Sequence, residues 1–345
     1  MAAYQLYTLA PDEEDVKVFT NHPTLYFDDG NLILSCGNTL FRVHRSIIAK
    51  HSPVIRQTLD NTQLHTLRGC QHLPLGDNPV DIEALLSVLY DGLRVNFPMI
   101  TTSTFPLLSR LLHASTRYKV ETIRADLLAC IQNEWPSLLH LHDMKMQAIW
   151  TNEFPKPSAA LHGGQADHDP NPPVLAVQHQ DAPVNPALVI RLLRETKAGP
   201  DHLLFPLFYA MSLETVQSGP LVRGARIAPL DNSDVERLIA GIEELRSRHS
   251  LMAVQCPQVL NPPHDATCLA GIRKCWCVIA PDLLLAPEMA RRPIEAWRNF
   301  IAHFSTPACQ AGFSFCYTCA TMLVEVLEHS RSTLWNDLAT FFELC

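Results

Sequence analysis

The chain has 345 residues, of which 47% are apolar and 18% charged. This length predicts about two domains of ~100–200 residues each, with enough apolar side chains to build their cores. The net charge of −8 argues against nucleic acid as the main partner, and no apolar run approaches the ~18 residues that a membrane-spanning helix needs.

The start of the chain and its cysteine content indicate the cellular compartment. The opening sequence, MAAYQLYTLAPDEED, lacks the basic and apolar regions of a secretory signal. Eleven cysteines in a chain of this length do not resemble the pattern of a small, disulfide-stapled secreted domain. We therefore expect a cytoplasmic or nuclear protein with reduced thiols, which is not secreted and does not act at a membrane.

Short strands are expected after an N-terminal tail at residues 1–20. Residues 24–27 and 32–35 are β-prone runs, and the Asp-Asp-Gly-Asn sequence between them signals a hairpin or a bend. A third strand is expected at residues 40–43, where Phe41 and Val43 share one face of an alternating pattern.

Helices are expected next. Apolar residues from Ile82 to Tyr90 recur at the spacing of one helical face and form an amphipathic stripe. The same spacing begins again at Leu108, and Val120 starts a further apolar repeat. We expect this mixed strand and helix unit to span residues 21–135.

A proline-rich segment follows the first unit. From Pro157 to Ile190 there is no Lys or Arg, and the prolines interrupt any periodic apolar face. Such a segment cannot bury enough surface to offset the entropy of ordering it. We therefore predict that residues 136–186 are a linker and largely disordered, with solvated histidines at His140 and His142.

Residues 187–345 are predicted to form a helical domain. Asn185 and Pro186 indicate the start of a helix, with proline at the tolerated first position. Asp201 is expected to cap the next helix, and Ser233 is the first residue of a capping-box pattern. Apolar residues near the end of the chain predict one or two long helices.

Several motifs of the first unit occur in a characteristic order. They are an aromatic-x-x-His element at Phe41–His44, a Ser-Pro turn at Ser52-Pro53, the Leu-Pro-Leu sequence at 73–75, a helix that ends at Tyr90-Asp-Gly92, and two paired helices at 107–127. In this order the motifs resemble a BTB/POZ domain. The resemblance implies an α+β fold in which a small sheet lies against a helical cluster, with structural roles for the Phe, His, Ser, Pro, Tyr and Gly of these motifs.

The region after the linker is also similar to part of a known group. The sequence FYAMS at residues 208–212, the helix expected at 234–245 and the cysteine-rich end resemble the C-terminal region of fungal proteins that contain a BTB/POZ domain. This resemblance implies a fungal-type BTB/POZ protein but no activity for the region.

The resemblance implies a function in protein–protein interaction. Domains of this family commonly form homodimers through their N-terminal elements, and such interfaces are more apolar than ordinary surface. Leu25, Phe27, Ile47 and Ile48 are the candidates for that interface, unless they fill the core of the domain itself. The alternative function is a substrate adaptor of a cullin-type ubiquitin ligase. It is not favoured, because the sequence IRQTLDNTQL lacks the apolar-x-acidic triplet of cullin-binding relatives.

The cysteines of the C-terminal half are the candidate metal ligands. Cys316 and Cys319 are three residues apart, which places both thiols on one side of a helix or knuckle. Cys268 and Cys275 supply a second pair, and two such pairs match the four ligands of a structural zinc site. The alternatives are that these thiols pack as small apolar side chains, or that Cys316 and Cys319 are a redox pair.

Motifs for catalysis are missing from the sequence. It contains no dinucleotide-binding glycine motif, P-loop, H-E-x-x-H, G-x-S-x-G or zinc-deaminase pairing. We therefore expect no catalysis and no cofactor other than the possible zinc ion.

Overall fold

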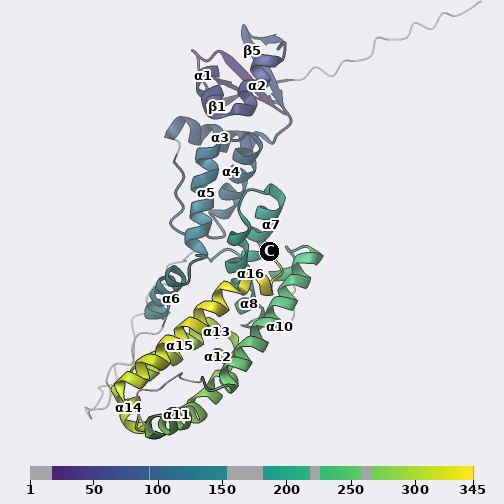
Figure 1. Cartoon of the computed structure of the whole chain (residues 1–345). Helices are drawn as coiled ribbons and strands as arrows, with labels where there is room; N and C mark the ends of the chain where they lie inside the picture. Colours follow the sequence, from purple (N-terminus) through teal and green to yellow (C-terminus); the bar gives the residue numbers. More distant parts are fainter. Residues whose placement is uncertain (1–17, 93, 154–181, 218–225, 258–265, 345) are drawn as a thin grey trace, which may run out of the picture. The chain divides into compact units, whose positions relative to one another are not determined.

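The computed structural model describes residues 18–92, 94–153, 182–217, 226–257 and 266–344 (Figure 1). The chain divides into two compact units. The first consists of the residues up to Asn96 together with Leu107–Leu127, and the second of Phe97–Pro106 together with Leu128–Cys345. Each unit is described separately below.

The first unit contains a five-stranded sheet with the strand order β1-β3-β2-β5-β4. The strands are β1 (Thr20–Tyr26), β2 (Leu32–Cys36), β3 (Thr39–Val43), β4 (Thr66–Leu67) and β5 (Cys70–Leu75). Strands β2 and β3 form an antiparallel hairpin, whose turn requires Gly37 because the backbone there has a φ of 55°. Strand β2 is buried along its whole length.

The first strand does not pair as the sequence suggested. Strand β1 is parallel to β3 and is not a neighbour of β2 in the sheet. The sequence at residues 28–31 is therefore a bend that carries the chain past β3, and the hairpin alternative was wrong. The predicted strands at 24–27, 32–35 and 40–43 correspond to β1, β2 and β3.

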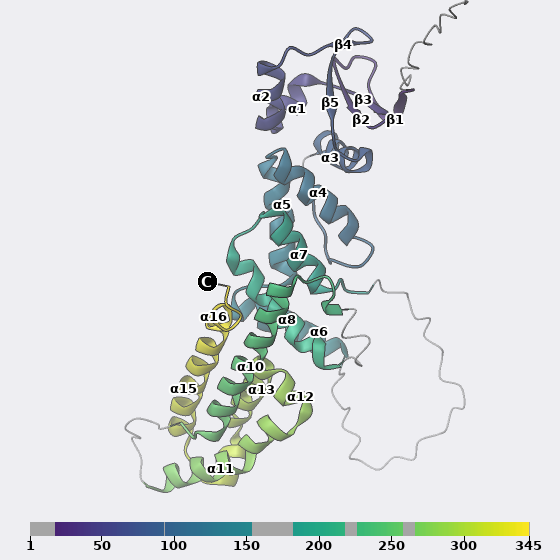
Figure 2. The same cartoon turned by 90° about the vertical axis from the view of Figure 1, so that its right-hand side faces the viewer.

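Helices cover the sheet within the first unit. They include α1 (Arg45–His51), α2 (Pro53–Asn61) and α3 (Pro79–Asp91). Figure 2 shows α1 and α2 to one side of the strands and α3 at the lower end of the sheet, where α3 contacts both α1 and β1. The predicted apolar stripe lies on α3 and buries Ile82, Leu85 and Leu86, so this prediction is confirmed. Helices α4 (Phe105–Arg117) and α5 (Glu121–Glu134) follow.

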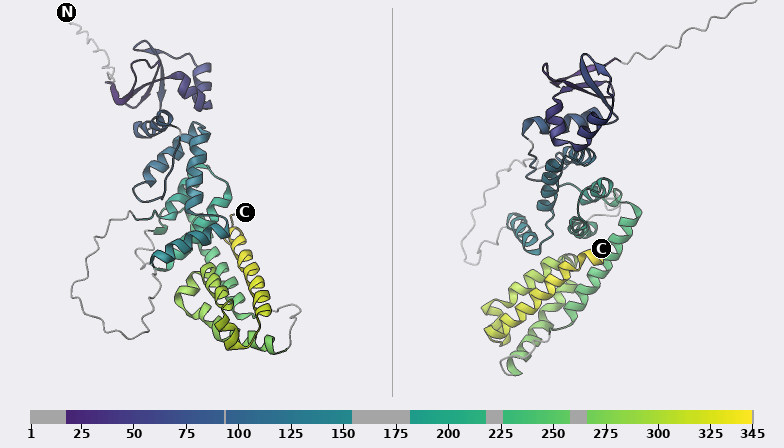
Figure 3. Two further views of the ribbon diagram at one scale, coloured as in Figure 1. Left: turned by 90° about the vertical axis from the view of Figure 1, so that its left-hand side faces the viewer. Right: turned by 45° about the horizontal axis from the view of Figure 1, so that its top comes forward.

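The second unit is helical in the part that the structure describes. Its helices are α6 (Leu139–Glu153), α7 (Pro186–Thr196), α8 (Leu204–Gln217), α10 (Asn232–Val254), α11 (Ala266–Leu285), α12 (Pro287–Arg291), α13 (Pro293–Phe304), α14 (Pro307–Phe313), α15 (Tyr317–Asn336) and α16 (Leu338–Phe341). Helix α13 packs along α15, drawn in yellow in Figure 3, and α10 contacts α11, α13 and α16. None of the helices in the described ranges has the length and apolar content to cross a bilayer.

The predicted linker is shorter than residues 136–186. Residues 139–153 form α6, Pro183 forms an isolated bridge with Thr101, and Val184 is buried. The linker prediction was therefore wrong at both ends. Residues 154–181, like most of the N-terminal tail, lie outside the described residues.

Helix caps in the second unit follow the sequence only in part. Asn185 caps α7, as predicted, through a bond from the Ala187 N–H to its side chain. Helix α10 is capped by Asp231, whose carboxylate accepts the N–H of Asp234 at 2.7 Å, and not by Ser233. Asp201 lies inside a short 3₁₀ helix and does not cap it.

Candidate functional site

His44 links the end of β3 to the C-terminal end of α3. The backbone N–H of His44 donates to the Tyr90 hydroxyl at 2.9 Å, and its Nδ1 lies 3.0 Å from the same oxygen. Its Nε2 lies 3.2 Å from the exposed carboxylate of Asp29, and this hydrogen bond lowers the pKa of Asp29. All these groups are satisfied when Tyr90 donates to Nδ1 and the Nε2 proton faces Asp29. His44 therefore contacts both α3 and Asp29 within the domain, and its structural role stays a prediction.

Ser52, which lies between α1 and α2, connects these helices to the turn between α4 and α5 in the first unit. Its hydroxyl accepts the Ile55 N–H at 3.1 Å, which caps α2, and donates to the carbonyl of Tyr118 at 2.7 Å. Pro53 occupies the first turn of α2, where a missing N–H costs nothing. The Tyr118 hydroxyl donates to Asp77, and burial raises the pKa of Tyr118 well above its usual value.

The remaining motif residues also serve the fold. Phe41 is fully buried, and its ring stacks on His22 with the ring centroids 4.9 Å apart. Gly92 ends α3 with a φ of 127°, a conformation that side chains rarely adopt. Both contacts lie within the fold, and the structural roles that the resemblance implied stay predictions.

The four residues predicted for a dimer interface have different environments. Leu25 and Ile48 are buried within the first unit, so they offer no accessible surface to a partner. Phe27 is half-buried, with its ring centroid 4.7 Å from that of Tyr90, and Ile47 is half-buried on α1. Only Phe27 and Ile47 therefore stay candidates.

The structure brings together three of the four predicted metal ligands. The Sγ atoms of Cys268, Cys316 and Cys319 all lie within 4.8 Å of one another. Cys275 does not join them. It lies seven residues beyond Cys268 on α11, ~10 Å along a continuous helix, and its Sγ is 3.4 Å from that of Cys309 on α14.

Sequence reasoning missed a buried polar cluster in the second unit. The Nε2 of His142 lies 2.8 Å from Glu295 Oε1, and the Tyr209 hydroxyl donates to Oε2 at 2.7 Å. Burial raises the pKa of Glu295, but the bonds from His142 and Tyr209 outweigh it, and the net pKa is lowered. His142 was predicted to be solvated, and that prediction was wrong because α6 carries it into the helical core.

A second buried contact holds the same helix. The guanidinium of Arg331 on α15 donates to both carboxylate oxygens of Asp143 and, through Nε, to the Ile294 carbonyl at 2.9 Å. Arg331 is only 2% exposed. The sequence signal that could have predicted this burial is the position of Arg331 between Leu327 and Leu334 on the apolar face of its helix.

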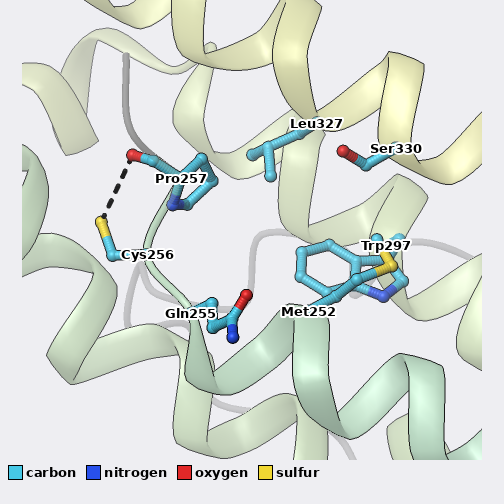
Figure 4. A pocket seen from close by; sticks show the side chains of 7 residues that line it. All are labelled: Met252, Gln255, Cys256, Pro257, Trp297, Leu327 and Ser330. Atoms are coloured by element: carbon cyan, nitrogen blue, oxygen red, sulfur yellow. Dashed lines mark hydrogen bonds between the residues drawn. The ribbon is translucent and has the colours of Figure 1, made fainter. Parts of the chain in front are cut away.

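A cavity of about 490 Å³ opens between helices of the second unit. It is lined by Met252, Gln255, Cys256, Pro257, Trp297, Leu327 and Ser330 (Figure 4). Burial raises the pKa of Cys256, so its thiol stays protonated at neutral pH. Among the residues that the structure describes, those lining this cavity include no carboxylate, histidine or lysine and form no acid–base pair.

One comparison with known proteins identifies a domain in the N-terminal part of the chain. The family model of the BTB/POZ domain matches residues 27–128, inside the predicted range of 21–135. No curated protein and no solved structure shows a significant match to the chain, so the likeness of the C-terminal half to fungal proteins stays a prediction. The match and the sheet with its helical cluster together show that residues 27–128 form a BTB/POZ domain, followed by a mostly helical C-terminal region.

Proposed function

We propose that this protein acts by binding protein partners through its BTB/POZ domain, and that one of these partners is a second copy of the chain. The proposal is supported chiefly by the match of residues 27–128 to a domain that serves as a protein–protein interaction module. The motif residues of the domain agree with this, because His44 and Ser52 are used in contacts within the fold and not in chemistry. The C-terminal helical region then presents a second surface for partners.

The N-terminal elements favour side-chain contacts over strand addition. Strand β1 lies at the end of the sheet order, but Pro23 has no N–H, and the N–H groups of Thr24 and Leu25 donate to His22 Nδ1. An edge with its donors occupied pairs poorly with another strand. Self-association is therefore expected through apolar side chains beside β1, with Phe27 and Ile47 at the contact.

Light scattering coupled to size-exclusion chromatography tests this proposal. The full chain has a mass of 38.6 kDa, and the expected result is twice that mass over a range of micromolar concentrations. Ile47→Glu is expected to shift the mass to that of a monomer. Val80→Glu, which changes an exposed residue in the first turn of α3, is the matched control and is expected to leave the dimer intact.

Two results would contradict self-association. One is a monomer mass for the unaltered chain at every concentration, and the other is a dimer that Ile47→Glu does not weaken although circular dichroism shows the variant to be folded.

A cullin-adaptor function is the alternative, and no described contact favours it. Residues 55–64 lack the apolar-x-acidic triplet of cullin-binding relatives, and Asp60 in that segment pairs with Arg45 at 2.7 Å. Purified cullin is therefore not expected to co-elute with the chain. A stable complex of the two would replace the proposal with the adaptor function.

A further inference from the structure

Three cysteine thiols from two helices meet in the second unit, and we define them as the thiol cluster: Cys268, Cys316 and Cys319. Cys268 lies in the first turn of α11, Cys316 immediately before α15, and Cys319 in the first turn of α15. Cys268 and Cys319 are buried, whereas Cys316 is partly exposed. All three are free thiols, so the cluster is not explained by a disulfide.

The sulfur positions suit a thiophilic cation. A tetrahedral zinc ion with Zn–S bonds of ~2.3 Å holds its sulfur ligands about 3.8 Å apart. The three Sγ atoms already lie within 4.8 Å of one another, so small side-chain rotations bring them to that spacing. Thiols are weak hydrogen-bond donors and acceptors, and three of them gain little from one another without a cation.

The start of α15 suits a thiolate at Cys316. Its Sγ accepts the Cys319 N–H at 3.4 Å, at the helix end where the dipole favours negative charge. Because cysteine binds a metal as the thiolate, a bound divalent cation displaces the thiol protons of the cluster.

The backbone around the cluster is held in place by close packing. A Cβ atom on Gly271 of α11 would lie 2.3 Å from the Phe313 carbonyl oxygen, so only glycine allows α11 to approach the turn before Cys316 this closely. Ser314 in that turn has a φ of 58°. The two segments that carry the thiols are therefore fixed against each other before any ion binds, which lowers the cost of ordering the ligands.

We propose that the thiol cluster binds one zinc ion through its three thiolates, with the fourth coordination position on the partly exposed side of Cys316 taken by solvent. The ion joins the start of α11 to the start of α15 and so stabilises the C-terminal helices. This site is independent of the proposed partner binding by the BTB/POZ domain.

Metal analysis of the purified full chain tests the site. After dialysis in reducing buffer, the expected content is about one equivalent of zinc, and replacement by cobalt is expected to give a thiolate-to-cobalt charge-transfer band. Cys319→Ser is expected to lose both signals. Cys277→Ser is the matched control, because it removes an exposed thiol of α11 outside the cluster, and it is expected to keep both.

A second variant, Cys316→Ser, tests the site in case Cys319→Ser does not fold. Cys316→Ser alters the partly exposed ligand and is expected to weaken zinc retention at least tenfold while the far-ultraviolet circular dichroism stays unchanged. The proposal is overturned by a zinc content below a tenth of an equivalent together with no charge-transfer band, by equal retention in Cys277→Ser and Cys316→Ser, or by a Cys316–Cys319 disulfide found in the native protein by mass spectrometry.

Discussion

Replacing Arg331 with methionine tests what holds α6 to the rest of the C-terminal region. The substitution keeps an unbranched apolar side chain but removes the donors to Asp143 and to the Ile294 carbonyl. Breaking a buried ion pair from one side costs about 3–5 kcal/mol, because the remaining charge is left uncompensated. Asp143 is 23% exposed and has Arg298 at 4.0 Å, so we expect the free energy of unfolding to fall by about 2–4 kcal/mol.

Tryptophan fluorescence reports this loss without interference from the BTB/POZ domain. All five tryptophans lie at position 135 or later, which places them in the second unit. In urea titrations, the Arg331→Met midpoint is expected to fall clearly, whereas Arg248→Met, which removes an exposed contact to Glu244, is expected to leave it unchanged. Equal midpoints for the two variants would refute the reasoning.

Three further predictions concern pH, helix capping and packing. The pKa of Glu295 is lowered in the folded protein. Its contribution to stability is therefore complete above the ordinary glutamate pKa of 4.5 and is lost as the pH falls through the pKa of the folded state. Glu295→Gln is expected to reduce the loss of stability in acid, measured by tryptophan fluorescence. Ser52→Ala removes a helix cap and a buried hydrogen bond and is expected to destabilise the first unit by about 1–3 kcal/mol, measured as faster hydrogen exchange in α2. Gly241→Ala places a Cβ 1.9 Å from the Phe342 ring and is expected to cost about 1–3 kcal/mol in urea titrations, whereas Gly312→Ala, with open space around it, is expected to be neutral.

The BTB/POZ domain was predictable because its signals are local. The amphipathic stripe of α3, the Ser-Pro start of α2 and the strand periodicities each lie within a short window of sequence, and all of them appear in the structure. The pairing of β1 was not predictable in this way. A parallel neighbour is selected by contacts across the sheet, and the turn-like residues at 28–31 are compatible with both a hairpin and a bend.

The thiol cluster was also predictable only where its sequence signal is local. The spacing of Cys316 and Cys319 is a property of one helical turn, and both contribute to the cluster. The prediction that both Cys268 and Cys275 join them failed because α11 is continuous, which a run of apolar residues and cysteines does not reveal. Once the segment is helical, the two thiols are separated by two turns, and each meets a different partner.

Helix α6 shows why composition misjudged residues 139–153. The partners of His142 and Asp143 lie 153 and 188 residues away in the chain, so no local sequence pattern predicts these contacts. Entropy arguments based on apolar content assume that only apolar burial offsets ordering, but here buried ionic contacts hold the helix. Ionic contacts depend on the ionisation state of their side chains, whereas apolar packing does not. Protonation of Glu295 in acid is therefore expected to weaken one of the two buried contacts of α6, so that amide exchange in α6 rises before it rises in α10 and α15, which bury apolar residues along their length.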